Sequence, residues 1–178
     1  CYCGVMCIGA NIVRISMNEQ FNSKSASEQE ITLYCYIGES VSAIQYLEDC
    51  LNHSIVIKSE RPKVREEADS LLLKYRSFTL GRAINFAEKH KLYSELLFKE
   101  LRSLLSERNW LIHKSISQSR DDWGSNIVRE ELLLRIKTIS NTSFTLMRKL
   151  EEDLITFSEV NCVDMSQVKV EIHKYYNE

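Results

Sequence analysis

Apolar residues recur at steps of three and four along most of this chain. That spacing is the period of an amphipathic α-helix, whose apolar stripe packs against a core. Polar stretches separate the helical segments, and Pro62 interrupts the pattern because proline lacks a backbone N–H. The pattern predicts helices over residues 28–57, from about 62 to 75, and over 80–90, 92–116, 126–157 and 168–175.

Capping and turn residues favour the same fold class. Ser27 and Glu30 form a capping-box pattern at the first helix, and Thr79 is a candidate N-cap for the short helix. Gly38 interrupts the first helix and would permit close approach of another backbone. One Pro and five Gly are too few for the tight turns of a sheet protein. We therefore predict an all-α fold, an antiparallel helical bundle of about five helices.

The length of 178 residues suits one domain. We expect residues 28–178 to form a single α-helical domain. Residues 1–27 would be an N-terminal extension that is either disordered or introduced with an expression vector. Because Met17 is a plausible natural start, residues 1–16 would be a vector remnant or an upstream read-through. No apolar run is long enough to span a membrane, and the apolar N-terminus lacks the basic start of a signal peptide. We therefore expect a cytoplasmic protein that does not associate with membranes.

Charge and cysteine content narrow the function classes. A formal net charge of -2 provides no broad positive surface for nucleic acid, so any such contact must be local. The six cysteines are too unevenly spaced for a secreted disulfide framework. We expect Cys35 and Cys50 to be small core residues. Cys1, Cys3 and Cys7 lack a clear fourth ligand, so we expect neither a metal site nor a cofactor.

The helix over 92–116 carries an unusual cluster near its end, formed by Arg108, Asn109 and His113. Arg108 occupies a position of the apolar stripe where the pattern requires a leucine, and arginine is rarely buried without a partner. Asn109 and His113 lie about 40° apart on the helix, while Arg108 is about 140° from His113. The long arginine side chain can span that difference, so the three groups can line one patch.

An arginine and a histidine together suit phosphate chemistry. The guanidinium offers a planar fork of donors to phosphate oxygens, and the imidazole moves protons near neutral pH. In RNA the 2′-OH beside each phosphodiester is a built-in nucleophile, so a base and a cation suffice for cleavage to a 2′,3′-cyclic phosphate. Arg108 and His113 therefore point to metal-independent cleavage of RNA. Arg102 and Lys114 are the candidate RNA-binding residues.

The segment Arg108–His113 resembles the Arg-x4–6-His motif of the HEPN superfamily (higher eukaryote and prokaryote nucleotide-binding domains), in which a polar residue often follows the arginine. The resemblance covers this motif and, loosely, the helical layout from about residue 30 to 157. It implies a homodimeric endoribonuclease whose two motifs share one cleft. Arg108 would stabilise the phosphorane, His113 would act as acid or base, and Asn109 would orient one of them. It also implies a toxin or antiphage-defence effector with an antitoxin or regulatory protein as partner.

Two alternatives remain open. The chain could be a non-catalytic interaction or nucleotide-binding module of a toxin-antitoxin or defence system. In a purely structural role, Arg108 would pair with an acid such as Glu107, and His113 would cap carbonyls near the helix end. We expect Trp110 to pack rather than to stack on bases. Some HEPN toxins carry a tyrosine two residues after the histidine that their partner modifies, and Ser115 departs from this pattern.

Overall fold

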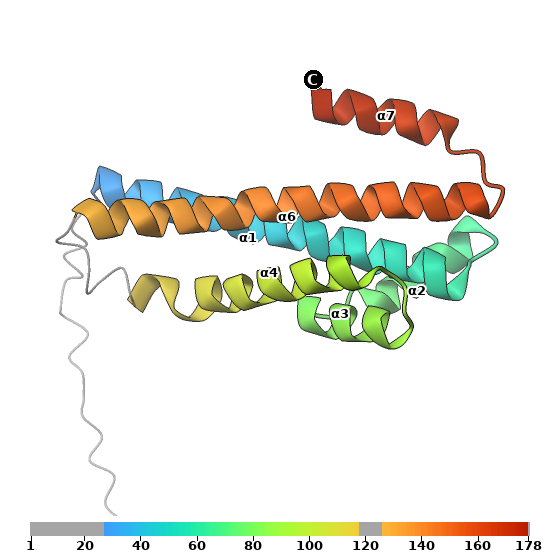
Figure 1. Ribbon diagram of the computed structural model, residues 1–178, viewed down its shortest axis with the longest axis horizontal. Coiled ribbons are helices and arrows are strands. Elements are labelled where there is room, and N and C mark those ends of the chain that lie inside the picture. Colours follow the sequence, from blue (N-terminus) through green and yellow to red (C-terminus); the bar gives the residue numbers. More distant parts are fainter. Residues whose placement is uncertain (1–26, 118–125, 178) are drawn as a thin grey trace, which may run out of the picture.

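A computed structural model describes residues 27–117 and 126–177, and the regular secondary structure of these residues is helical throughout (Figure 1). The all-α prediction is therefore confirmed. The predicted N-terminal extension, with Cys1, Cys3 and Cys7, lies outside the described residues. The elements are α1 (Glu28–Ile55), the π-helical turn η1 (Val56–Glu60), α2 (Arg65–Tyr75), α3 (Leu80–Lys89), α4 (Glu95–His113), α6 (Asn126–Val160) and α7 (Ser166–Asn177).

The two longest helices, α1 and α6, lie side by side and run in the same direction (Figure 1). Near their N-terminal ends, the Ser40 hydroxyl donates to the carbonyl of Ile136 at 2.8 Å. At the other end, the buried Lys58 ammonium, just beyond α1, binds the carboxylate of Asp153 and the carbonyl of Leu92. Residues early in α1 thus contact residues early in α6, and the end of α1 lies near the end of α6, so the two helices are parallel. The antiparallel packing predicted from the sequence therefore does not extend to this pair.

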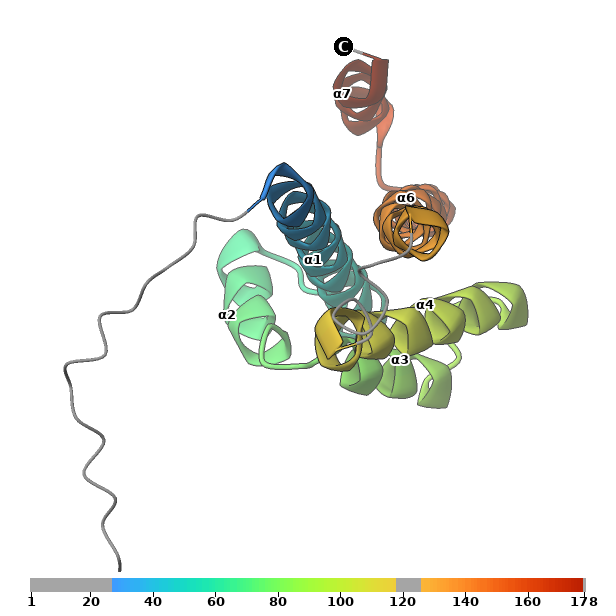
Figure 2. The same ribbon diagram turned by 90° about the vertical axis from the view of Figure 1, so that its left-hand side faces the viewer.

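Helix α4 runs antiparallel to α6, as expected for the bundle. Glu100 near its start pairs with Lys149, and Glu107 nearer its end pairs with Arg135. Viewed end-on, α1 lies between α2 and α6, with α3 and α4 beneath (Figure 2). The last turns of α4 consequently lie near the N-terminal end of α6.

The core lies between α1, α3, α4 and α6. Its side chains are mainly aliphatic, and burial of each large one contributes about 1.5–3 kcal/mol of transfer free energy. Tyr75, Phe78 and Phe86 form a cluster of rings at 5.0–5.9 Å between centroids where α2 meets α3. The largest fully buried side chains are Tyr75, Leu47, Leu51, Ile55, Leu80, Ile84, Leu101, Leu104, Ile136, Ile139, Leu146 and Leu150.

Both predicted helix caps are present. The Ser27 side chain accepts from the Glu30 N–H, and the Glu30 carboxylate accepts from the Ser27 N–H at 2.8 Å. Thr79 Oγ1 accepts from the N–H of Arg82 at 3.4 Å. Each cap satisfies backbone donors that have no partner within the first turn of a helix.

The cysteine predictions are half correct. Cys50 packs against the core, and burial together with the nearby Glu151 and Asp49 carboxylates raises the pKa of its thiol to about 12. Cys35, in contrast, is exposed. It lies two residues from the buried Leu33, about 200° around the helix, so the buried stripe of α1 is narrower than its apolar pattern indicates.

Gly38 does not meet another backbone, contrary to the sequence-based expectation, because no atom lies within 4 Å of a Cβ placed there. We expect Gly38→Ala to raise the free energy of unfolding by about 0.5–1 kcal/mol, since alanine loses less backbone entropy in a helix. Urea denaturation of both proteins measures this. Gly81→Ala is the comparison for a helical glycine in a packed environment, because its methyl group would contact Leu105 at 3.5 Å whereas that of Gly38→Ala would contact nothing within 4 Å. A loss of stability in Gly38→Ala would contradict the open environment.

Candidate functional site

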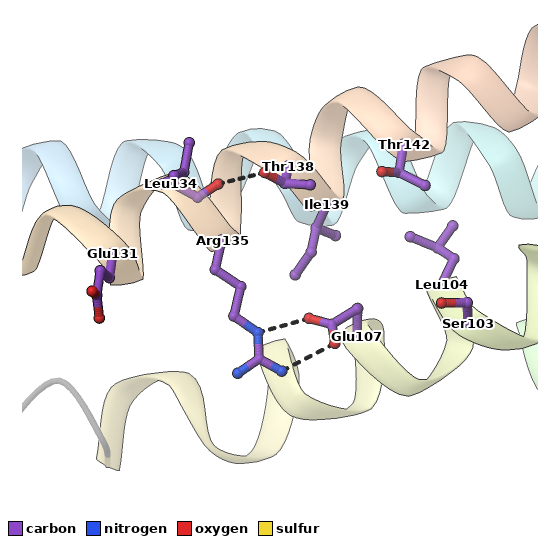
Figure 3. Close-up of a pocket in the computed structure, with 9 residues that line it drawn as sticks. All are labelled: Ser103, Leu104, Glu107, Glu131, Leu134, Arg135, Thr138, Ile139 and Thr142. Atoms are coloured by element: carbon purple, nitrogen blue, oxygen red, sulfur yellow. Dashed lines mark hydrogen bonds and ion pairs between the residues drawn. The ribbon is translucent and has the colours of Figure 1, made fainter. Parts of the chain in front are cut away.

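A forked ion pair holds the C-terminal half of α4 against α6 (Figure 3). Arg135 donates from Nε to one oxygen of Glu107 at 2.7 Å and from Nη2 to the other at 3.0 Å. Its guanidinium carbon also lies 3.7 Å from the centre of the Trp110 ring. The two charged side chains are 44% and 38% exposed, so solvent screening limits the pair to about 1 kcal/mol or less. Its main effect is to fix the orientation of α4.

This ion pair determines the environment of Arg108. Glu107, which could have neutralised its neighbour, is instead engaged by Arg135. Arg108 is half-buried, between the buried Leu104 one turn earlier and the buried Leu111 one turn later. Its Nη1 donates to the Asn109 side-chain oxygen at 3.4 Å, and no ion pair joins it to a carboxylate of another described residue. Within residues 27–117 and 126–177, no carboxylate therefore neutralises its guanidinium charge.

His113 is the last residue of α4 and is exposed. It lies one turn beyond Asn109, and no hydrogen bond or ion pair joins its ring to another described residue. The helix ends at Lys114, whose N–H donates to the carbonyl of Trp110 at 2.8 Å. The carbonyl-capping role considered for His113 is thus not found in the described part of the chain. Its imidazole is accessible for proton transfer.

No described element packs on the outer face of α4 around these residues. Helix α3 packs along α4 only as far as Leu105, which approaches Gly81 (Figure 1). Beyond that point Ile112 is 47% exposed and Ile116 is 44% exposed. On the helix surface Ile112 lies between Arg108 and His113. Among the residues that the structure describes, the motif therefore lies on an exposed, partly apolar surface of α4.

The two candidate RNA-binding residues have different surroundings. Lys114 is exposed directly after His113. Arg102 forms an ion pair with Glu88 of α3, with Nε 3.3 Å from Oε1, about one and a half turns before Arg108. The structure thus places Lys114 beside the motif and leaves Arg102 apart from it. The RNA-binding roles of both stay predictions.

Ser115 and Trp110 are both buried. The Ser115 hydroxyl donates to the carbonyl of Leu111 at 2.6 Å, so it points at its own helix and is closed to a modifying enzyme. Trp110 packs under Arg135, which agrees with the packing role expected for it. Sequence reasoning missed Arg135 because it lies on another helix. The available signal was the spacing of Glu107, three residues after Leu104 and four before Leu111, since a carboxylate beside an apolar stripe requires a cation.

A shallow groove of about 420 Å³ follows the seam between α4 and α6 (Figure 3). Leu104 and Ile139 form its apolar floor, and the Glu107–Arg135 pair crosses it. None of Arg108, Asn109 and His113 lines it. The lining residues are Ser103, Leu104, Glu107, Glu131, Leu134, Arg135, Thr138, Ile139 and Thr142.

Comparison of the chain with protein-family models, with curated proteins and with solved structures found no match. The HEPN resemblance therefore rests on the motif residues and the helical layout, and it stays a prediction. Within residues 27–117 and 126–177, no group of three or more His, Cys, Asp or Glu side chains is arranged to hold a metal ion. No helix in these ranges is long and apolar enough to cross a lipid bilayer.

Loss of the Arg135 fork should loosen the end of α4. We expect Arg135→Gln to lower the free energy of unfolding by about 1 kcal/mol or less and to speed amide hydrogen exchange over residues 108–113. Hydrogen exchange read by mass spectrometry measures this. Lys149→Gln is the matched control, because Lys149 joins the same two helices through Glu100 with similar exposure. Equal acceleration in both variants would contradict a specific role for Arg135.

Proposed function

We propose that this protein is a cytoplasmic, metal-independent endoribonuclease of the HEPN type. The observation that carries the proposal is the state of Arg108, a half-buried guanidinium without a paired carboxylate among the described residues. It lies at the end of a fixed helix, and the accessible imidazole of His113 is five residues further on. A cation that is held in place but not neutralised suits a phosphodiester, because guanidinium and phosphate form paired hydrogen bonds.

The reaction requires one bond to form and one to break at phosphorus. The 2′-oxygen of the RNA attacks the adjacent phosphorus and gives up its proton to a base, while the bond to the 5′-oxygen breaks and that oxygen takes a proton. The products are a 2′,3′-cyclic phosphate and a 5′-hydroxyl. His113 acts in proton transfer, and Arg108 stabilises the negative charge of the phosphorane. Asn109 positions Arg108 rather than His113, because its side-chain oxygen accepts a hydrogen bond from Arg108.

A second copy of the chain completes this site in our proposal. One imidazole cannot accept the 2′-proton and donate the 5′-proton at the same moment, so two copies of His113 divide these roles. The exposed apolar Ile112 between Arg108 and His113 supports pairing through this face. A two-fold axis here would bring both motifs into one cleft.

In the cell we propose that the enzyme acts as a toxin or antiphage-defence effector restrained by a protein partner. A ribonuclease that needs no metal or cofactor requires such restraint, because its reactants are always present. Restraint by modification of a side chain two residues after the histidine does not fit this chain. That position is Ser115, whose hydroxyl is buried and bonded to Leu111.

A non-catalytic binding module is the second candidate. It is supported by the net charge of -2 and by the open position of the motif, which does not line the α4–α6 groove. RNA-cleaving enzymes usually present more positive surface. The two functions differ in one respect: an enzyme depends on His113 for turnover, whereas a module that binds an anion depends mainly on Arg108.

The enzyme hypothesis predicts cleavage of single-stranded RNA or tRNA by the wild type in EDTA. We expect Arg108→Ala and His113→Ala each to lower the rate at least about 100-fold, since each removes transition-state stabilisation or proton transfer. Labelled RNA resolved on denaturing gels measures the rates.

Lys99→Ala serves as the control, because Lys99 is an exposed cation of the same helix. It should retain activity, and circular dichroism should show that all four proteins are folded. RNA binding without cleavage by the wild type, weakened by Arg108→Ala alone, would instead support the binding module.

The shared-cleft hypothesis predicts that Ile112→Asp makes the protein monomeric and lowers RNA cleavage at least about tenfold, because a buried carboxylate at a two-fold interface meets its own copy. Analytical ultracentrifugation and the cleavage assay measure the two effects. Leu96→Asp is the matched control, since Leu96 is 67% exposed at the opposite end of α4. A wild type that is monomeric at every concentration yet cleaves RNA would refute the shared cleft.

A further inference from the structure

A second and larger groove lies far from the motif, between α1, α6 and α7. Helix α7 turns back along α6 but stands apart from it in both views (Figures 1 and 2). The space between them has a volume of about 860 Å³. Its lining residues are Tyr46, Asp49, Cys50, His53, Met147, Glu151, Leu154, Asp164, Gln167, Val168, Glu171, Ile172 and Tyr175.

The apolar side chains of α7 leave this groove unfilled. Val168, Ile172 and Tyr175 recur at helical spacing and all line the groove. Val168 nevertheless remains 42% exposed and Tyr175 remains 74% exposed. Across the groove Tyr46 of α1 is 61% exposed. Removal of apolar surface from water is favourable, so this arrangement favours an additional apolar segment between the helices.

The charge of the groove restricts what that segment can be. Carboxylates line it from every side: Asp49 of α1, Glu151 of α6, Glu171 of α7, and Asp164 between the last two helices. No Lys or Arg is among the described residues that line it. Arg76 of α2 at 3.1 Å and His53 at 3.7 Å both approach Asp49, so the acidic character of the groove rests mainly on Glu171 and Asp164. The groove as a whole therefore attracts cations and repels nucleic-acid phosphates.

We propose that this groove is a docking site for a cationic amphipathic helix of a protein partner. The apolar face of that helix packs on Met147, Leu154 and Ile172, and its Lys and Arg side chains meet the surrounding carboxylates. Helix-in-groove binding of this kind needs apolar anchors at helical spacing together with complementary charge. Helix α7 of a second copy also carries cations, Lys169 and Lys174, but it is a poorer occupant because Lys169 already pairs with Glu159 and Glu171 would meet the same carboxylates. This interaction is independent of the Arg108–His113 site.

The probe is a fluorescent peptide of leucine and lysine with leucine at helical spacing, titrated with the full chain and followed by anisotropy. We expect it to bind, and we expect a peptide with glutamate in place of each lysine not to bind. Glu171→Lys should weaken binding about tenfold or more, because it reverses one charge in the groove. Ile172→Asn, which removes an apolar anchor without adding a charge, should weaken it similarly. Glu66→Lys, the same change on exposed α2, should leave it unchanged.

Hydrogen exchange with the bound peptide locates the site, and protection should be confined to α7 and the facing turns of α1 and α6. Absence of binding, equal binding of the glutamate peptide, or equal weakening by Glu171→Lys and Glu66→Lys would overturn the proposal. If Glu171→Lys instead dissociates a wild-type dimer in ultracentrifugation, the groove holds a second copy and not a partner helix. RNA cleavage by Glu171→Lys should equal that of the wild type, which keeps this test separate from the proposed enzymatic function.

Discussion

The parallel packing of α1 on α6 is the constraint from which the rest of the arrangement follows. Two parallel helices cannot be joined by a short turn, so the chain between them must return along the bundle. Helices α2 and α3 make the turn, and α4 makes the return over 19 residues, about 28 Å. The buried contacts of Ser40 and Lys58 with α6 fix the register of the pair. Consequently the end of α4, with its arginine and histidine, lies at the N-terminal end of α6.

The candidate site depends on the partner of one carboxylate, that of Glu107. Glu107 and Arg108 are adjacent in sequence, and an acid beside an arginine ordinarily lowers its attraction for anions. Here Arg135 engages Glu107 and covers Trp110, which directs the acid toward α6. The ion pair contributes little to stability because it is half exposed. Its importance lies in engaging Glu107, the acid next to Arg108, while holding the helix that carries both residues.

Helical periodicity and capping residues were sufficient to predict the all-α fold, the first helix start at Ser27 and the cap at Thr79, because these are local properties. The parallel direction of α1 and α6 and the Arg135 contact are tertiary, and no local pattern contains them. The incorrect prediction that Cys35 is a core residue has the same cause, because the apolar character of a residue does not show which face of α1 other helices cover. For the site, the positions of Arg108, Asn109 and His113 on one helix end followed from the sequence, whereas their catalytic roles remain proposals.

The chemistry of the cut RNA ends tests the central proposal most directly. Wild-type protein is incubated in EDTA with a single-stranded RNA, and with the same RNA carrying one 2′-deoxynucleotide at the cut position. Mass spectrometry then identifies the ends. Attack by the 2′-oxygen predicts a 2′,3′-cyclic phosphate and a 5′-hydroxyl from the first RNA, and no cleavage at that position in the second. Ends with a 3′-hydroxyl and a 5′-phosphate, or cleavage unaffected by the 2′-deoxy substitution, would contradict it.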